Sequence, residues 1–166
     1  SEMCIRDRYE LYNAKSSFRK YIFQRLENFN NKEIVNVPEL LEENKLTIEH
    51  IMPQTMTLEW RKELGANWEL IYTKYLHTIG NLTLSAYNSD YSNLSFTKKK
   101  ELKDKGFNFS KLQLNEFVRN QDKWGEKEII TRANELSAIA KEIWFIPETS
   151  YAPQDEVETC LLYTSP

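Results

Sequence analysis

Hydrophobic residues recur at helical spacing near both ends of the chain. Within residues 14–29 they form one stripe, which predicts a helix that buries a single face and ends at Asn30-Asn31: Phe18, Tyr21, Ile22, Leu26 and Phe29. Apolar residues three or four positions apart within 129–143 predict a longer amphipathic helix that ends before Pro147. Shorter helices are predicted at 38–43, 58–64 and 68–76, with Gly65 separating the last two.

The middle of the chain carries a different pattern. Residues 46–51 alternate apolar and polar positions and predict a short strand that Pro53 stops, and residues 81–84 predict a second strand after a turn at Gly80. Residues 87–93 are polar and turn-like, and Ser95 begins a basic helix that reaches about residue 105, with Gly106 as its C-terminal stop. We therefore expect a mostly α-helical α+β protein in which helices surround a small two-stranded antiparallel hairpin.

Composition fits one globular domain or a piece of a larger protein. The chain has 166 residues, of which 40% are hydrophobic and 13% aromatic, so wholesale disorder is not expected. Residues 98–105 hold a cluster of lysines that begins Lys98-Lys99-Lys100, although the net charge is -3. This run is either a local phosphate-binding patch or a solvated helix face. No stretch is apolar enough to span a bilayer and no secretory signal is visible, so we expect a cytoplasmic protein without a membrane partner.

Two cysteines, Cys4 and Cys160, lie near opposite ends, and no Cys-x-x-Cys pair occurs, so we expect neither a structural zinc site nor a disulfide framework. The end segments SEMCIRDR (1–8) and CLLYTSP (160–166) resemble translated sequencing adapters and are set aside as non-native. We expect an N-terminal helical segment at 9–45, a core at 46–105, a C-terminal helical segment at 106–147 and a partly non-native, disordered tail at 148–166.

The candidate chemistry begins with adjacent acidic and imidazole side chains in IEHIMPQ (48–54). Alternate strand residues face opposite sides, so Glu49 and His50 can flank one pocket only at a strand end or a bulge. The segments LHTIGNLTL (76–84) and NSDYSNLSFTKKK (88–100) then place Asn81 at a strand start and Asn88 ahead of the lysines. Each of these residues alone is also typical of a strand edge, a turn or a cap.

In this order, the three segments resemble an HNH (ββα-metal) nuclease motif, and the closest likeness is to the C-terminal domain of GmrSD-like, modification-dependent (type IV) restriction endonucleases. The resemblance covers about residues 15–147, including the tail from Trp124. It implies an endonuclease that hydrolyses DNA with one divalent metal, Mg²⁺ or alternatively Mn²⁺, with 46–105 as the nuclease core. It also implies a ParB-like nucleotide-handling domain in the same full-length protein and a role in restricting modified phage DNA.

The resemblance assigns His50 as general base, Glu49 and Asn88 as metal ligands, and Asn81 as the residue that orients the loop carrying His50. Phosphodiester hydrolysis suits these types, because an imidazole titrates near neutral pH and a hard cation accepts oxygen ligands. Many HNH motifs carry Asp where this chain has Glu49. Asp90 falls where many of them place the last ligand, whereas the shorter spacing of GmrSD-like sequences favours Asn88, so both stay open.

Other assignments remain alternatives. His77 is either a helix-end histidine that bonds nearby carbonyls or a contact to DNA or to the motif loop. Lys98, Lys99 and Lys100 are candidates for holding the DNA backbone. A non-catalytic nucleic-acid-binding or assembly module on the same scaffold is the main alternative function, and a toxin or homing nuclease is a third.

Overall fold

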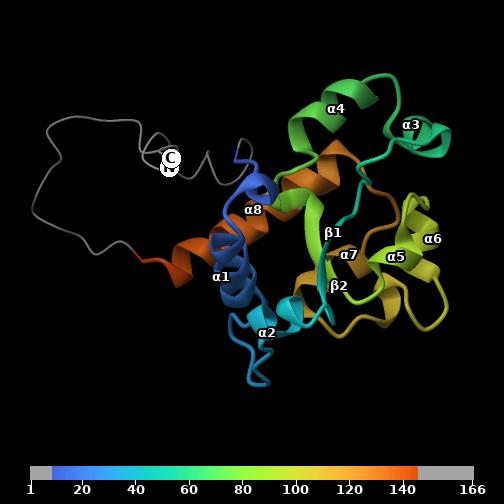
Figure 1. Cartoon of the computed structure of the whole chain (residues 1–166). Coiled ribbons are helices and arrows are strands. Elements are labelled where there is room, and N and C mark those ends of the chain that lie inside the picture. Colours follow the sequence, from blue (N-terminus) through green and yellow to red (C-terminus); the bar gives the residue numbers. More distant parts are fainter. Residues whose placement is uncertain (1–8, 146–166) are drawn as a thin grey trace, which may run out of the picture.

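The computed structural model describes residues 9–145, which form short helices around one pair of strands (Figure 1). β1 (Thr47–His50) and β2 (Leu82–Ser85) pair antiparallel, with Glu49 opposite Thr83 and His50 opposite Leu82. The expected mostly helical α+β fold with an antiparallel hairpin is confirmed. The expectations for residues 1–8 and for the tail beyond 145 lie outside the described residues.

Helices precede, interrupt and follow the hairpin. α1 (Ser16–Glu27) and α2 (Val37–Glu42) come first, and α3 (Leu58–Leu64) and α4 (Trp68–Tyr75) lie in the connection between the strands. α5 (Asn88–Tyr91), α6 (Phe96–Glu101), α7 (Glu116–Arg119) and α8 (Glu126–Ile143) follow β2. Short 3-10 turns occupy 11–13, 79–81, 107–109 and 113–115. No helix in the described part of the chain is long and apolar enough to cross a membrane.

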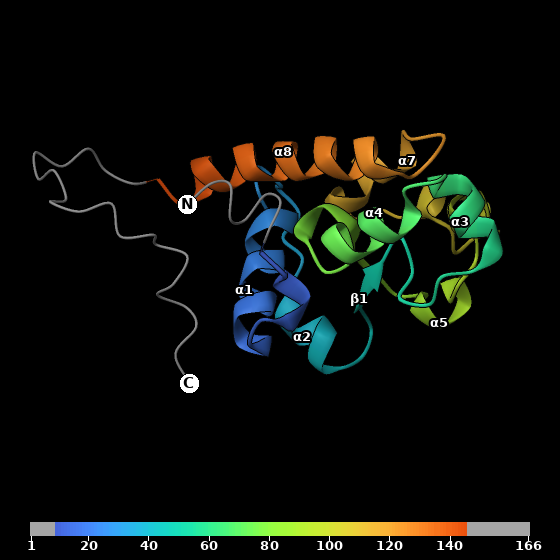
Figure 2. The same ribbon diagram turned by 90° about the horizontal axis from the view of Figure 1, so that it is seen from above.

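α8 extends along one side of the molecule and joins its two hydrophobic clusters (Figure 2). Near its start, Ile129 packs with Trp60 and Trp124 in the cluster beside α3, α4 and α6. Near its other end, Leu136 belongs to the cluster formed with Phe23 of α1 and the strand residues of β2. The amphipathic stripe predicted at 129–143 therefore serves two cores, one on each side of the hairpin.

Arg132 of α8 fixes the turn that leads into β2. Its side chain is 1% exposed, and its Nη1 donates to the carbonyls of Ile79, Gly80 and Leu82 at 2.7–3.0 Å. A side chain at Gly80 would come 2.5 Å from the carbonyl oxygen of Ile129, so α8 can approach this turn only because a glycine stands there.

The basic helix is shorter than predicted. α6 ends at Glu101, and the left-handed conformation in the following turn belongs to Asp104, with φ 60°. Gly106 has φ -65° and is not the helix stop expected from the sequence. A glycine is needed there because a Cβ would collide with the backbone of Lys100 and Leu102. Residues 88–91, expected as a polar turn, form the short helix α5.

Candidate active site

Glu49 and His50 are both buried at the end of β1, with exposed fractions of 3% and 4%. Because consecutive strand residues alternate, the two side chains have different neighbours. Glu49 contacts Lys99 of α6, and His50 contacts His77, which follows α4. The structure therefore brings the acid and the imidazole to one strand end but directs them to different partners.

Lys99 contacts both the Glu49 side chain and the backbone of the two residues that follow it. Its fully buried Nζ donates to Oε1 of Glu49 at 2.6 Å and to the carbonyl oxygens of His50 and Ile51 at 2.9 and 3.1 Å. Burial raises the pKa of Glu49 to about 7, against the opposing charge of Lys99. Burial also lowers the pKa of Lys99, which the Glu49 carboxylate counteracts. The lysine thus holds the carboxylate and the chain just beyond the strand in one position.

Asn81 holds the segment that follows His50. Its Oδ1 accepts from the backbone N–H of Met52 at 2.8 Å and from Trp124 Nε1 at 3.1 Å. Its Nδ2 donates to the carbonyls of Met52 and Leu76, both at 3.0 Å. The side chain is fully buried, and its backbone carbonyl accepts from Ile51 N at 3.0 Å. An asparagine supplies the acceptor and the donor that this clamp on Met52 requires.

His50 lies in an aromatic environment. Its Nε2 is 3.1 Å from Nδ1 of His77, and the ring of Tyr12 meets it edge-on at a centroid distance of 4.4 Å. Burial, together with the nearby His77 and Lys99, lowers the pKa of His50 to about 3. The imidazole is consequently neutral at pH 7 and keeps a lone pair that can accept a proton.

Asn88, the first residue of α5, contacts β1, the strand that carries Glu49. Its Nδ2 donates to the carbonyl of Ile48 at 3.2 Å, and Ile48 directly precedes Glu49 in β1. Asp90, the alternative ligand, is exposed and forms an ion pair with Lys105 at 2.6 Å. The structure therefore associates Asn88, and not Asp90, with the backbone of β1.

The three consecutive lysines have different environments. Lys98 is exposed and pairs with Glu59 at 3.2 Å, whereas Lys100 donates to the carbonyl of Gln121 at 2.5 Å and lies 3.8 Å from Asp122. Lys99 is in the interior, so the expectation of a surface contact with DNA does not fit its position. Lys99 follows Phe96 by three positions, so the two side chains lie on the same face of the helix, and Phe96 is buried. This three-residue spacing is the sequence signal that could have indicated the burial of Lys99.

Residues 3–139 match the model of the family described as GmrSD restriction endonucleases, C-terminal domain. The chain belongs to this family. A search of curated proteins found no match. Membership in the GmrSD C-terminal domain family places the chain among restriction-endonuclease domains and implies a nuclease-related function on DNA.

Glu49 and Asn88 each keep one side-chain oxygen without a hydrogen-bond donor in this GmrSD C-terminal domain, among residues 9–145. Glu49 uses Oε1 for Lys99 and Asn88 uses Nδ2 for Ile48, and within residues 9–145 no hydrogen-bond donor contacts Glu49 Oε2 or Asn88 Oδ1. These are the oxygen types that Mg²⁺ prefers, and Mg²⁺ retains several waters, so few protein ligands suffice. No group of three or more His, Cys, Asp or Glu side chains that could hold a metal occurs in the described residues.

Two contributors were not anticipated from the sequence of this GmrSD C-terminal domain. Tyr12 precedes the first long helix, in a segment without any motif, yet its ring touches both histidines. Arg132 lies in the last predicted helix, where a charged residue is expected to face solvent. Only the packing of α8 shows that its side chain binds the turn before β2.

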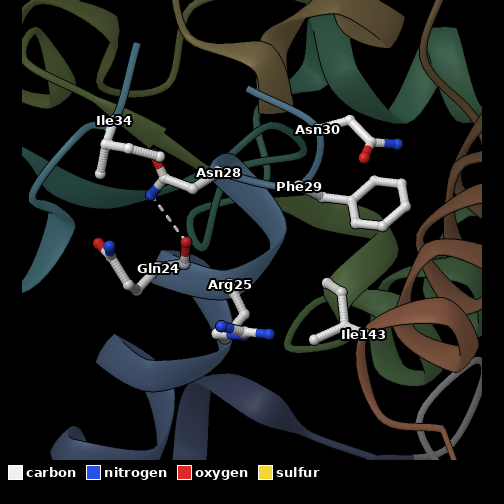
Figure 3. A pocket seen from close by; sticks show the side chains of 7 residues that line it. All are labelled: Gln24, Arg25, Asn28, Phe29, Asn30, Ile34 and Ile143. Atoms are coloured by element: carbon white, nitrogen blue, oxygen red, sulfur yellow. Dashed lines mark hydrogen bonds between the residues drawn. The ribbon is translucent and has the colours of Figure 1, made fainter. Parts of the chain in front are cut away.

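A hollow of about 320 Å³ lies elsewhere in the domain, between the end of α1, the following loop and the end of α8 (Figure 3). Arg25, Phe29 and Ile143 contribute to its wall, and Asn28 closes one side by donating to the carbonyl of Gln24 at 2.8 Å. None of the candidate active-site residues lines it.

Proposed function

We propose that this domain is a metal-dependent DNA endonuclease of the HNH type. The observation that carries the proposal is that a buried neutral imidazole, His50, and a buried carboxylate, Glu49, occupy consecutive positions at the end of β1. Asn88 contacts the backbone of the same strand. Buried titratable groups with shifted pKa values are typical of active sites.

In this proposal His50 accepts the proton of the attacking water. The water oxygen forms a bond to phosphorus, the bond from phosphorus to the leaving oxygen breaks, and that oxygen leaves with the electron pair and then takes up a proton. Glu49 and Asn88 would hold a divalent cation, Mg²⁺ or Mn²⁺, which when bound supplies positive charge against the charge of the phosphorane and the leaving oxygen.

Asn81 is a positioning residue in this scheme. It contacts the backbone of Met52 on both its N–H and its carbonyl, and it thereby limits the movement of the chain directly after His50. Such preorganisation matters because a displacement of about 1 Å at a reacting group can cost about 100-fold in rate.

The wider role follows from the family description, which names restriction endonucleases. We propose that the domain acts in the cytoplasm against modified phage DNA and that a ParB-like nucleotide-handling domain of the same protein controls it. Lys98, as an exposed cation beside α3, is a candidate contact to a DNA phosphate, and its pairing with Glu59 would open when DNA binds.

One observation favours a second candidate, a nucleic-acid-binding module without catalysis. The ammonium group of Lys99 already neutralises Glu49 at 2.6 Å, which reduces the charge available to a cation. In this case DNA would bind, but no cleavage would depend on His50.

Nicking of supercoiled plasmid separates the two candidates. The protein is incubated with Mg²⁺, with Mn²⁺ or with EDTA, and His50→Ala is compared with Thr55→Ala, an exposed control in the loop after the same strand. We expect metal-dependent nicking that His50→Ala lowers by about 100-fold or more, since a general base contributes about 100- to 10,000-fold. Gel retardation should be unchanged. If wild type and His50→Ala both retard DNA and neither nicks it, the binding module is correct.

The ligand assignment is tested by Mn²⁺ binding, measured by electron paramagnetic resonance without DNA. Glu49→Gln and Asn88→Ala should weaken Mn²⁺ binding and raise the metal concentration needed for nicking. Asp90→Ala is the matched control, because Asp90 pairs with Lys105. Weaker Mn²⁺ binding in Asp90→Ala alone would transfer the ligand role to Asp90.

A further inference from the structure

Among residues 9–145, one nitrogen of the His50 ring has a hydrogen-bond partner and the other has none. Nε2 of His50 lies 3.1 Å from Nδ1 of His77, and within the described residues no group hydrogen-bonds to Nδ1 of His50. A hydrogen bond between these two facing nitrogens requires that one carries a proton and donates and that the other is unprotonated and accepts. In a neutral imidazole only one of the two ring nitrogens carries a proton. Which histidine donates decides which nitrogen of His50 is unprotonated.

His77 is held firmly enough to impose that choice. Its ring stacks on Tyr12 at a centroid distance of 5.4 Å and an angle of 13°, and its backbone carbonyl accepts from Tyr12 N at 3.2 Å. Tyr12 is fixed in turn, because Arg19 Nη1 donates to its carbonyl at 2.6 Å and the guanidinium group lies 5.3 Å from the centre of its ring.

We propose that His77 is the positioning residue of His50: its unprotonated Nδ1 accepts the proton of His50 Nε2, which holds the ring in the tautomer whose free Nδ1 receives the proton of the attacking water. The proposal rests on the base role of His50 proposed above. The opposite arrangement, in which His77 donates, would leave the proton on Nδ1 of His50 and no lone pair outside the contact. A histidine base commonly owes its tautomer and orientation to the partner of its second nitrogen.

The arrangement also explains why a histidine stands at position 77. An aromatic ring is required for the stacking contact with Tyr12, and an acceptor at the Nδ1 position is required for the contact with His50. Histidine provides both, whereas phenylalanine provides only the ring and asparagine only the acceptor, in its Oδ1 atom. These two residues therefore separate the two contacts experimentally.

The experiment compares His77→Asn with His77→Phe in the same plasmid assay and by ¹⁵N NMR. The chain contains two histidines, so each variant leaves His50 as the sole source of imidazole signals and its two nitrogens are assigned without ambiguity. In His77→Asn we expect one predominant tautomer, protonated on Nε2, and a kcat for nicking within a few-fold of wild type. In His77→Phe we expect a mixture of tautomers and a kcat lower by about 10- to 100-fold, the usual effect of losing such an orienting partner. KM for DNA should change in neither.

Three results would count against the proposal. Equal tautomer populations for His50 in both variants would show that His77 does not set the tautomer. Greater activity in His77→Phe than in His77→Asn would show that stacking on Tyr12, and not the acceptor, is what matters. A parallel rise in KM would indicate a DNA contact instead. If wild type itself does not nick DNA, the proposed function fails, but the NMR comparison still decides whether His77 controls the His50 ring.

Discussion

Replacing Lys99 with methionine would test how the buried pair at the hairpin contributes to stability. The lysine side chain is fully buried, and its ammonium group contacts the Glu49 carboxylate and two backbone carbonyls. Methionine preserves most of the length and the apolar stem, so Lys99→Met removes chiefly the charge and its hydrogen bonds.

The structure gives the scale of the effect. Burial raises the pKa of Glu49 from 4.5 to about 7 even with Lys99 beside it. At about 1.4 kcal/mol per pKa unit, the ionised carboxylate is disfavoured by about 3 kcal/mol before the substitution. Removing one partner of a buried ion pair typically costs about 3–5 kcal/mol. We therefore expect the free energy of unfolding of Lys99→Met to be lower than that of wild type by about 3–5 kcal/mol at pH 8.5.

The sign of the pH dependence follows from the same pKa. A carboxyl whose folded pKa is raised contributes stability that is fully present below its unfolded value of 4.5 and is lost as the pH rises through the folded pKa, here about 7. Without Lys99 the folded pKa of Glu49 rises further, so in the variant the loss continues to higher pH. The difference between wild type and Lys99→Met should be larger at pH 8.5 than at pH 6.

Urea unfolding in EDTA, followed by circular dichroism and tryptophan fluorescence, measures these differences without bound metal. The control is the double variant Lys99→Met/Glu49→Gln, in which no unpaired carboxylate remains. It should be more stable than Lys99→Met by about 2 kcal/mol at pH 8.5, as expected when a buried charge is neutralised. A double variant no more stable than Lys99→Met, together with a pH-independent difference, would refute the assignment of Lys99 as the counter-ion of Glu49.

Two further substitutions test how α8 supports the turn before β2. Gly80→Ala places a Cβ 2.5 Å from the carbonyl oxygen of Ile129 and should lower the unfolding free energy by about 1–3 kcal/mol in thermal or urea unfolding. Gly125→Ala, whose Cβ would meet only Glu128 at 3.5 Å, serves as control, and an equal loss in both would contradict the steric argument. Arg132→Lys should cost about 2–4 kcal/mol, because one ammonium cannot replace a guanidinium that binds Ile79, Gly80 and Leu82 with Nη1 and Leu114 with Nη2. A loss below about 0.5 kcal/mol would show that these contacts contribute little.

Local patterns predicted most of the elements but not their exact limits. The stripe at 14–29 became α1 at Ser16–Glu27, and the alternation at 46–51 became β1 at Thr47–His50. Helix ends depend on which backbone groups find other partners. The basic helix ends at Glu101, ahead of the stop predicted at Gly106. In the turn that follows, Asp104 adopts the left-handed conformation, and Gly106 packs against the backbone of Lys100.

By itself, the sequence determined the helical and strand periodicities, the antiparallel hairpin and the order of the acid, the imidazole and the asparagines. The periodicities depend on residues that are neighbours in the chain, so spacing alone reveals them. The pairing of the two strands joins residues more than 30 positions apart and was expected from the order of the motifs. Only the tertiary structure decided that Lys99 turns inward to Glu49, that Tyr12 stacks on His77, and that His77 meets His50. Those contacts join segments far apart in the chain, and a charged or aromatic side chain carries no local signal of the partner that burial will give it.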